Sequence, residues 1–419
     1  METEGQTRAG AGVPNGARGR RAQAVGAWRR ALRRVRPRLT GAADEARALT
    51  AVTALGLLGG FALSHMLWLS SGRSFPAAPV FDFLPGVPRP FDLVWACALV
   101  ASLVCVVAST RQRRYVFAFL AIAVPLALLD QTRWQPWFYQ YLLMLAALSA
   151  RAGREVEALR ACGLIVAGTY FWGGAHKLNP QFFAEVVPSL AAELPASLAR
   201  LVTPAAFLIP LVEICTGVML LTRRWRRAGL VLALVTHASV LLLFFPARRN
   251  KVVWPWNAAM AGFVLLLFRR GAAGLKDFLP RRAASPQTMA VVLFGLMPAL
   301  SFFGLWGHFL SGSVYSGETA RARVRVSPEV ARGLPPKVRP KLRADGAAAW
   351  LDLNHWSYVE LKVPAYPSER TYRRAAARLC ESAVRPADVL LVMTEAPRLF
   401  GGEPPVTALD CDALAPPSR

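Results

Sequence analysis

Acidic residues and lysine are scarce in this sequence. It has 25 Asp and Glu against 50 Lys and Arg, and only 6 of the basic residues are Lys. It also has no glycine-rich phosphate loop, no nucleophile elbow, no haem-attachment motif and no Cys/His cluster at metal-ligand spacing. These absences argue against nucleotide hydrolysis and serine chemistry, and we expect no metal.

Long apolar runs recur through the first 307 residues. The hydrophobic fraction is 54% and the mean hydropathy is +0.34. Apolar runs near the ~20 residues that span a bilayer recur nine times. They are Leu49–Leu69, Phe91–Ser109, Tyr115–Leu129, Trp137–Ala150, Leu159–Leu178, Ala205–Leu221, Ala228–Phe245, Val253–Phe268 and Met289–Gly307. The sequence therefore predicts an all-α polytopic membrane bundle of about nine transmembrane helices.

The placement of the basic residues argues against nucleic acid as a partner. The tail Met1–Arg47 has 11 Arg and 4 acidic residues. Most of the remaining excess lies in short loops beside apolar runs, at Arg111/Arg113/Arg114, Arg151/Arg154, Arg223/Arg224/Arg226/Arg227 and Arg269/Arg270. This pattern is typical of cytoplasmic loops. We predict a bacterial inner-membrane protein in contact with lipid, with its N-terminus in the cytoplasm, its C-terminus outside, and no cleavable signal peptide.

The sequence divides into three parts: a basic cytoplasmic tail (1–47), a transmembrane domain (48–307) and an extracytoplasmic α+β domain (308–419). In the last part, hydrophobic patterning predicts strands at Ala322–Ser327, Trp350–Leu353, Val359–Val363 and Val389–Thr394, and a helix at Glu369–Ser382. Cys380 and Cys411 lie there and could pair in an oxidising compartment. We expect the other four cysteines, Cys97, Cys105, Cys162 and Cys215, to pack inside spans.

Lys177 is the most informative single residue, because a lysine ends an apolar run in a chain that otherwise uses arginine. Tyr170 and Lys177 are seven residues apart and share one helical stripe, and Gly168 and Gly174 would let another helix approach closely. A desolvated lysine can act as a base, whereas a lysine at a span end can also extend to the interface as an anchor. A cavity lined by Tyr170, Lys177 and Trp254 would favour a ligand site, and a lysine pointing to lipid would favour the anchor.

Further polar residues complete a candidate site on the predicted outer face. Glu213 and His237 lie inside predicted spans, where they could line a site or brace the bundle. The basic residues Arg248, Arg249 and Lys251, which follow the seventh apolar run, could hold an anionic group. They could also be an exception to the rule that basic residues lie in cytoplasmic loops. The predicted catalytic residues are Lys177 and His176; the predicted substrate-binding residues are Tyr170, Glu213, His237, Arg248, Arg249, Lys251, Trp254 and Asn257. Asp130 and Arg133 could form a local ion pair.

The stretch Tyr170-Phe-Trp-Gly-Gly-Ala-His-Lys-Leu-Asn179 resembles the Tyr-Phe-x-Ala-Gly-x-x-Lys-Leu stretch of HTTM-domain proteins, the group that includes vitamin K-dependent gamma-carboxylase. Glu213, the Arg-rich turn after Leu221, and His237 followed by Phe244-Phe245-Pro246 are similar to further elements of that family, as is Trp306–Gly317. The resemblance covers roughly Leu49 to Gly317. DoxX-like quinone-associated membrane proteins share a similar Gly-x-x-Lys-Leu pattern.

The HTTM resemblance implies oxygenation of reduced vitamin K or another quinol, coupled to proton abstraction and carboxylation of an exterior protein or peptide. Lys177 would be the base and His176 would tune it or relay the proton. The sequence departs from the carboxylase at His176, where that enzyme has a second lysine, and in Trp137–Leu148, which has no histidine. The alternative is a non-enzymatic membrane scaffold, or a quinone- or lipid-binding protein, whose exterior domain docks a partner.

Overall fold

The computed structural model of the protein describes residues 41–150, 153–244, 250–270, 273–400 and 402–414. The chain divides into two compact units, Met1–Asp44 and Glu45–Arg419. Nearly all of the predicted basic tail lies outside the described residues. The three-part division predicted from the sequence stays a prediction.

The described chain up to residue 303 is helical. Its elements are α2 (Ala42–Leu63), α3 (His65–Trp68), α4 (Phe91–Ala108), α5 (Gln112–Leu128), η1 (Gln131–Arg133), α6 (Pro136–Leu148), α7 (Glu155–Ala175), η2 (Phe182–Val186), α8 (Val187–Ala191), α9 (Ala196–Val202), α10 (Leu208–Leu221), α11 (Arg226–Phe244), α12 (Val253–Phe268), α13 (Leu275–Phe278), α14 (Pro286–Ala290), η3 (Val291–Leu296), α15 (Met297–Leu300) and η4 (Ser301–Phe303). The last four form one continuous helical stretch.

Three helical stretches within the described residues are long and apolar enough to cross a membrane: Ala42–Leu63, Phe91–Ala108 and Pro286–Phe303. Each of the nine predicted apolar runs coincides with helix, so the prediction of a mainly helical chain is confirmed. The count of nine spans is not confirmed. Among the remaining helices, α6 has only 13 residues, and α7 begins with Glu155, Glu157 and Arg160.

Helix α7 lies in the interior of the bundle and packs against α6, α10, α12 and α14. Small residues set its approach to its neighbours. A Cβ atom at Gly174 would lie 2.5 Å from the Pro210 carbonyl oxygen of α10, and one at Gly168 would lie 2.5 Å from the Phe294 carbonyl oxygen of η3. On α10, a Cβ at Gly217 would lie 2.7 Å from the Ala167 oxygen. The expected close helix approach at Gly168 and Gly174 is therefore confirmed.

A buried ionic cluster lies between α5 and α6. Asp130 pairs with Arg73 and accepts a hydrogen bond from the Thr132 amide at 3.0 Å, which caps η1. Arg133 instead donates to the carbonyl oxygens of Leu67 and Leu126, at 3.0 and 2.6 Å. The predicted local Asp130–Arg133 ion pair was therefore wrong, because the cap turns the carboxylate away. Burial raises the pKa of Asp130, but the Arg73 and Arg133 charges outweigh it and hold that pKa below 3.8.

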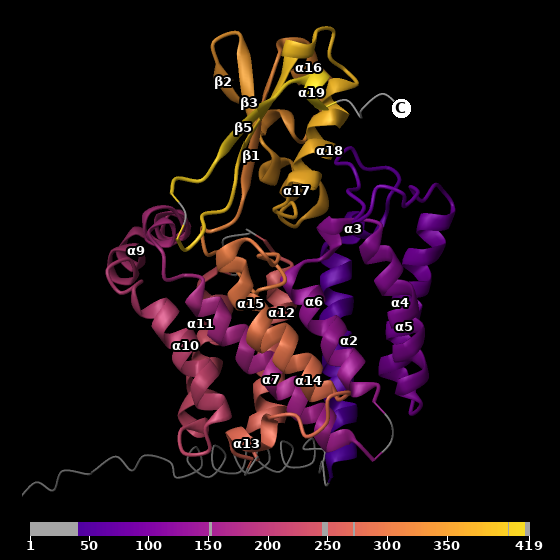
Figure 1. Cartoon of the computed structure of the whole chain (residues 1–419), viewed down its shortest axis with the longest axis vertical. Helices are drawn as coiled ribbons and strands as arrows, with labels where there is room; N and C mark the ends of the chain where they lie inside the picture. The colour runs from indigo at the N-terminus through magenta and orange to yellow at the C-terminus, as the bar shows by residue number, and fades with distance from the viewer. Residues whose placement is uncertain (1–40, 151–152, 245–249, 271–272, 401, 415–419) are drawn as a thin grey trace, which may run out of the picture. The chain divides into compact units, whose positions relative to one another are not determined.

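Residues beyond 320 form a five-stranded antiparallel sheet in the order β2-β3-β1-β4-β5. Its strands are β1 (Arg321–Val326), β2 (Arg343–Asp345), β3 (Ala348–Asp352), β4 (Val389–Thr394) and β5 (Val406–Leu409). The helical elements beside it are α16 (Pro328–Gly333), η5 (Arg339–Lys341), α17 (Leu353–Leu361), α18 (Glu369–Cys380), η6 (Pro386–Asp388) and α19 (Cys411–Leu414). Figure 1 shows this region beyond the end of the bundle that carries α3 and α15.

Most of the predicted elements of this region are confirmed, but the strand predicted at Val359–Val363 was wrong. Helix α17 occupies most of it. The Asp352 carboxylate accepts hydrogen bonds from the Asn354 and His355 amides, at 2.7 and 3.3 Å, and so caps the start of α17. Lys362, in the left-handed region at φ 64°, ends it. A capping aspartate at the last position of a strand is a local signal that a prediction from apolar patterning alone does not use.

The sheet region is attached to the bundle through loops. Glu360 of α17 accepts hydrogen bonds from the Ser74 hydroxyl at 2.7 Å and the Phe75 amide at 2.8 Å. Gln131 accepts one from the Ser368 hydroxyl at 2.6 Å, and Gln135 donates one to the Pro364 oxygen at 3.0 Å. These polar contacts fix the sheet region on the loops that precede α4 and α6.

Cys380 and Cys411 form a disulfide that ties the end of α18 to the start of α19. The sequence left this pairing open, and the structure shows it. Of the other cysteines, Cys162 is buried as expected, whereas Cys97 and Cys215 are exposed on their helices.

We predict that replacing both Cys380 and Cys411 by serine destabilises the sheet region by about 3–4 kcal/mol, because a cross-link over a separation of 31 residues restricts the unfolded chain. Limited proteolysis of the purified protein should then cut within residues 320–414 at lower temperature. Cys97→Ser is the matched control and should leave the cleavage temperature unchanged. Equal protease resistance of the double variant and the wild type would contradict the prediction.

Candidate functional site

One cavity of about 450 Å³ lies among α7, α10, α11 and α12. Residues of the η2–α9 segment and of the stretch 312–315 complete its wall, and apolar side chains make up most of the lining. The contributing parts of the helices are Thr169–Gly173 of α7, Leu208–Glu213 of α10, Val235–Val240 of α11 and Val253–Met260 of α12. Each is the part of its helix nearest the sheet region, so the cavity lies in that half of the bundle.

Lys177 follows the end of α7 and points into this cavity. It is 8% exposed. Its Nζ donates hydrogen bonds to the Glu213 carboxylate at 2.7 Å and to the Gly173 carbonyl oxygen at 2.9 Å. This geometry does not fit an anchor that extends to the interface. An ion-paired lysine donates hydrogen bonds and has no lone pair with which to abstract a proton.

A chain of hydrogen-bonded side chains in the cavity wall extends from α7 through α11 to α12. Asn257 donates from Nδ2 to the Val253 oxygen at 2.8 Å, so its Oδ1 is the atom that faces His237 Nδ1, also at 2.8 Å. His237 Nδ1 therefore carries the proton, and Nε2 accepts a hydrogen bond from the Tyr170 hydroxyl. Because that hydroxyl already donates, the Tyr170 oxygen can only accept from a ligand. The cavity thus offers a cationic donor at Lys177 and an acceptor at Tyr170.

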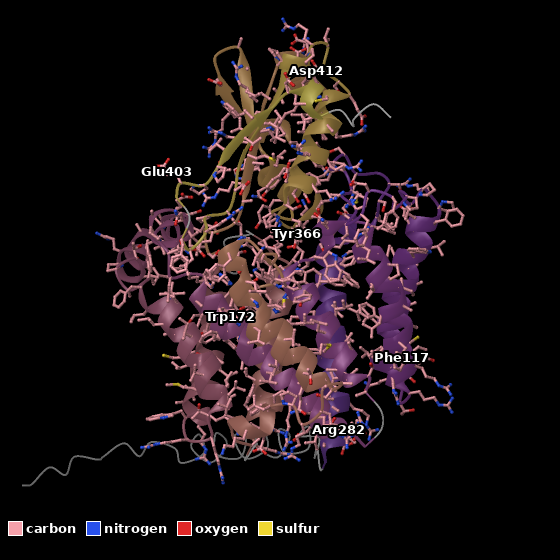
Figure 2. The ribbon with its side chains drawn as sticks, viewed as in Figure 1. Phe117, Trp172, Arg282, Tyr366, Glu403 and Asp412 are labelled. Carbon is pink, nitrogen blue, oxygen red and sulfur yellow. A yellow bond between two sulfur atoms is a disulfide. The ribbon has the colours of Figure 1, made fainter. Side chains whose placement is uncertain are left out.

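His176, the other predicted catalytic residue, faces away from the cavity. It is fully buried, stacks on the Phe302 ring at a centroid distance of 4.4 Å, and lies 3.9 Å from the Glu318 carboxylate. Trp172, labelled in Figure 2, packs beside it. Burial lowers the pKa of the neighbouring His308 to about 4, and the nearby His176 adds to the shift. The structure does not bring the two predicted catalytic residues onto one cavity, and their catalytic roles stay predictions.

The remaining predicted residues divide into two groups. Trp254 and Asn257 line the cavity, and the Lys251 ammonium lies 5.8 Å over the Trp254 ring. Arg248 and Arg249 lie outside the described residues. The sequence analysis favoured a ligand site if Tyr170, Lys177 and Trp254 lined one cavity. All three residues line this cavity.

Sequence reasoning missed the part of the wall that follows the last apolar run. Gly312, Val314 and Tyr315 line the cavity, and the Tyr315 hydroxyl accepts a hydrogen bond from Asn250 at 2.8 Å. Tyr315 and Asn250 both have positive φ, at 53° and 38°. No periodic signal marks such residues, because they lie in an irregular connection.

A protein-family comparison gives one match. The model described as "Methylamine utilisation protein MauE", a membrane-protein family, matches residues 155–240. No curated protein and no solved structure matches the chain. The match leaves residues 1–154 and 241–419 uncovered, so it shows a likeness over one stretch. Together with the apolar helices it supports a transmembrane protein.

This match corrects the HTTM resemblance. It covers Tyr170–Asn179, Glu213 and His237, which are among the residues on which the resemblance to the carboxylase group depended. Motifs built from small residues and one lysine are short, and close packing of membrane helices favours small residues in unrelated families. The assignment to HTTM-domain proteins was wrong, and nothing in the comparisons supports carboxylation.

We predict strong energetic coupling between Lys177 and Glu213. Lys177→Met and Glu213→Gln should each destabilise the protein by roughly 3 kcal/mol, since each leaves one buried charge without its partner. The double variant should lose at least ~1 kcal/mol less than the sum of the two. Unfolding in mixed micelles measures all four proteins. The exposed Arg321–Glu185 pair is the control and should couple by less than ~1 kcal/mol. If the stability losses of Lys177→Met and Glu213→Gln simply add in the double variant, the predicted coupling between the two side chains is wrong.

Proposed function

We propose that this protein is a polytopic membrane protein that binds a membrane-borne amphiphile, and that its role is binding rather than catalysis. The observation that carries this proposal is the apolar cavity of about 450 Å³ with the Lys177–Glu213 ion pair in its wall. Ligand cavities of this size, mostly apolar and with few convergent polar groups, are typical of small-molecule sites. The family match over residues 155–240 covers most of the walls.

The polar groups of the wall indicate the chemistry of the ligand. Lys177 can donate to a carbonyl, phosphate or ester oxygen, and Tyr170 can accept from a hydroxyl or amide. The rest of the lining suits a hydrocarbon or isoprenoid chain. An isoprenoid quinone or quinol, reduced vitamin K among them, and a polar lipid share this chemistry. The experiment below distinguishes these two classes of ligand.

The proposed topology has about nine membrane crossings in a bacterial inner membrane, with the N-terminus in the cytoplasm and the C-terminus outside. Arginine-bearing connections such as that at Arg282 lie at the bundle end remote from the sheet (Figure 2). The disulfide Cys380–Cys411 lies in the sheet region and suits an oxidising compartment. The preference of basic residues for cytoplasmic loops and the position of the disulfide therefore support the same orientation of the protein in the membrane.

A second candidate rests on the family match alone. The matched family is described as a methylamine utilisation protein, so an accessory membrane role in methylamine utilisation is open to test. A strain that lacks this protein should then grow normally on ammonium but poorly with methylamine as the nitrogen source. Equal growth of the mutant and its parent on methylamine would remove this candidate.

We predict that filling the cavity displaces its ligand. Val212→Trp places an indole in the cavity from α10, whereas Val218→Trp lies on the exposed face of the same helix and is the matched control. Both proteins are purified from native membranes and extracted with organic solvent, and quinones and lipids are quantified by mass spectrometry. The wild type and Val218→Trp should retain about one molecule per chain, and Val212→Trp at least tenfold less.

The identity of the retained molecule separates the two sources. A prenylated quinone identifies a quinone-binding protein, and a phospholipid or other polar lipid identifies a lipid-binding protein. Equal recovery of every species from Val212→Trp and Val218→Trp would contradict the proposal, because bulk lipid carried with the protein does not depend on the cavity.

A further inference from the structure

The exterior sheet has one covered face and one bare face. Strand β1 alternates strictly between buried and exposed residues. Val324 and Val326 point to the side that helices α16, α17 and α18 cover, and both are fully buried. Arg321, Arg323 and Arg325 point to the other side and are exposed. In Figure 1 the strands lie on one side of this region and the helices on the other.

Strand register defines the rest of the bare face. Arg325 lies opposite Trp350 on one side and Leu390 on the other, and Trp350 lies opposite Arg343 of β2. Arg323 lies opposite Asp352 on one side and Val392 on the other. We call this surface the arginine face, and its residues are Arg321, Arg323, Arg325, Arg343, Asp345, Trp350, Asp352, Leu390, Val392 and Val406. A basic row thus runs beside a strip of partly exposed apolar side chains.

The centre of the arginine face is ordered by its own contacts. The Asp345 carboxylate accepts hydrogen bonds from the Trp350 indole at 2.9 Å and from Arg325 Nε at 3.0 Å. The Arg323 guanidinium stacks on this fixed indole, and its central carbon lies 4.5 Å from the Trp350 ring centroid. A guanidinium stacked on an aromatic ring keeps its edge N–H groups free for a bidentate carboxylate. Arg323 is therefore preorganised to bind an anion.

The chain itself neutralises the arginine face only in part: Asp352, opposite Arg323, is engaged in capping α17. Arg321 pairs with Glu185 and Arg325 with Asp345. Within the part of the chain that the structure describes, no acidic side chain forms a salt bridge with Arg323 or Arg343. Two positive charges beside exposed apolar surface favour a partner that brings carboxylates and apolar side chains together. Arginine and tryptophan are also the residues that most often dominate binding energy at protein interfaces.

We propose that the arginine face is a docking site for an acidic, partly apolar segment of another protein. A lipid surface fits less well. The row follows β1 away from the bundle, since Arg321 pairs with Glu185 of η2, whereas Arg325 pairs in register with Trp350 beside the β2–β3 hairpin. Arg325 is four residues further along, or about 13 Å at the rise of an extended strand. A flat membrane could therefore touch only one end of the row. This proposal does not depend on the cavity.

The test uses the full-length protein in nanodiscs of uncharged lipid. The probe is a fluorescent ten-residue peptide that alternates Glu with Leu or Val, and the comparison peptide has Lys in place of Glu. Fluorescence anisotropy at ~0.15 M salt, where distant charges are largely screened, gives the dissociation constants. We expect the acidic peptide to bind and the basic peptide not to bind.

Charge-matched variants decide whether the face itself binds. Arg323→Glu with Arg343→Glu should weaken binding of the acidic peptide at least tenfold. Arg332→Glu with Arg385→Glu changes the net charge equally at exposed sites off the arginine face, and should change binding less than twofold. Arg323→Lys keeps the charge without the planar fork and should weaken binding about threefold, so the result does not rest on a charge reversal that could disturb folding.

Several outcomes would overturn the proposal. One is equal loss of binding in both charge-reversal variants, which would mean general attraction to a basic protein. Another is no binding of the acidic peptide to the wild type at millimolar concentration. A third is binding of vesicles rich in phosphatidylglycerol that depends on Arg323 and Arg343 while the peptide does not bind, which would assign the face to lipid.

Discussion

The ion pair between Lys177 and Glu213 is the interaction on which the site depends. Two charges withdrawn from water are tolerated only when they are close and further hydrogen-bonded, and Lys177 also bonds to the Gly173 oxygen. That proximity requires α7 and α10 to cross closely, which Gly174 permits because any side chain there would meet the Pro210 oxygen. The same crossing leaves α11 and α12 to close an apolar space around the pair.

Much of the fold follows from composition and periodicity. Apolar runs located the helices, and the alternation of Arg321–Val326 located the central strand of the sheet. What failed were features set by single contacts. The Asp352 cap turned a predicted strand into α17, and the Asp130 cap of η1 directed its carboxylate to Arg73 rather than Arg133. The number of membrane crossings also depends on helix lengths, which apolar content alone does not determine.

The site was predicted in part for a related reason. Seven-residue spacing placed Tyr170 and Lys177 on one stripe, and both line the cavity. Adjacency in sequence suggested that His176 acts with Lys177, yet neighbouring residues on a helix point in different directions, and His176 packs on Phe302. Short motifs also suggested the wrong family, because helix packing constrains them more than chemistry does.

The central claim is that the cavity holds a membrane-borne amphiphile with its polar group at Lys177. A cryo-electron microscopy map of the wild-type protein in nanodiscs made from native membrane lipid tests it most directly. We expect elongated density among α7, α10, α11 and α12 that ends within hydrogen-bond distance of Lys177 Nζ. A cavity that holds only separate water-sized peaks, or that is closed by side chains, would contradict it.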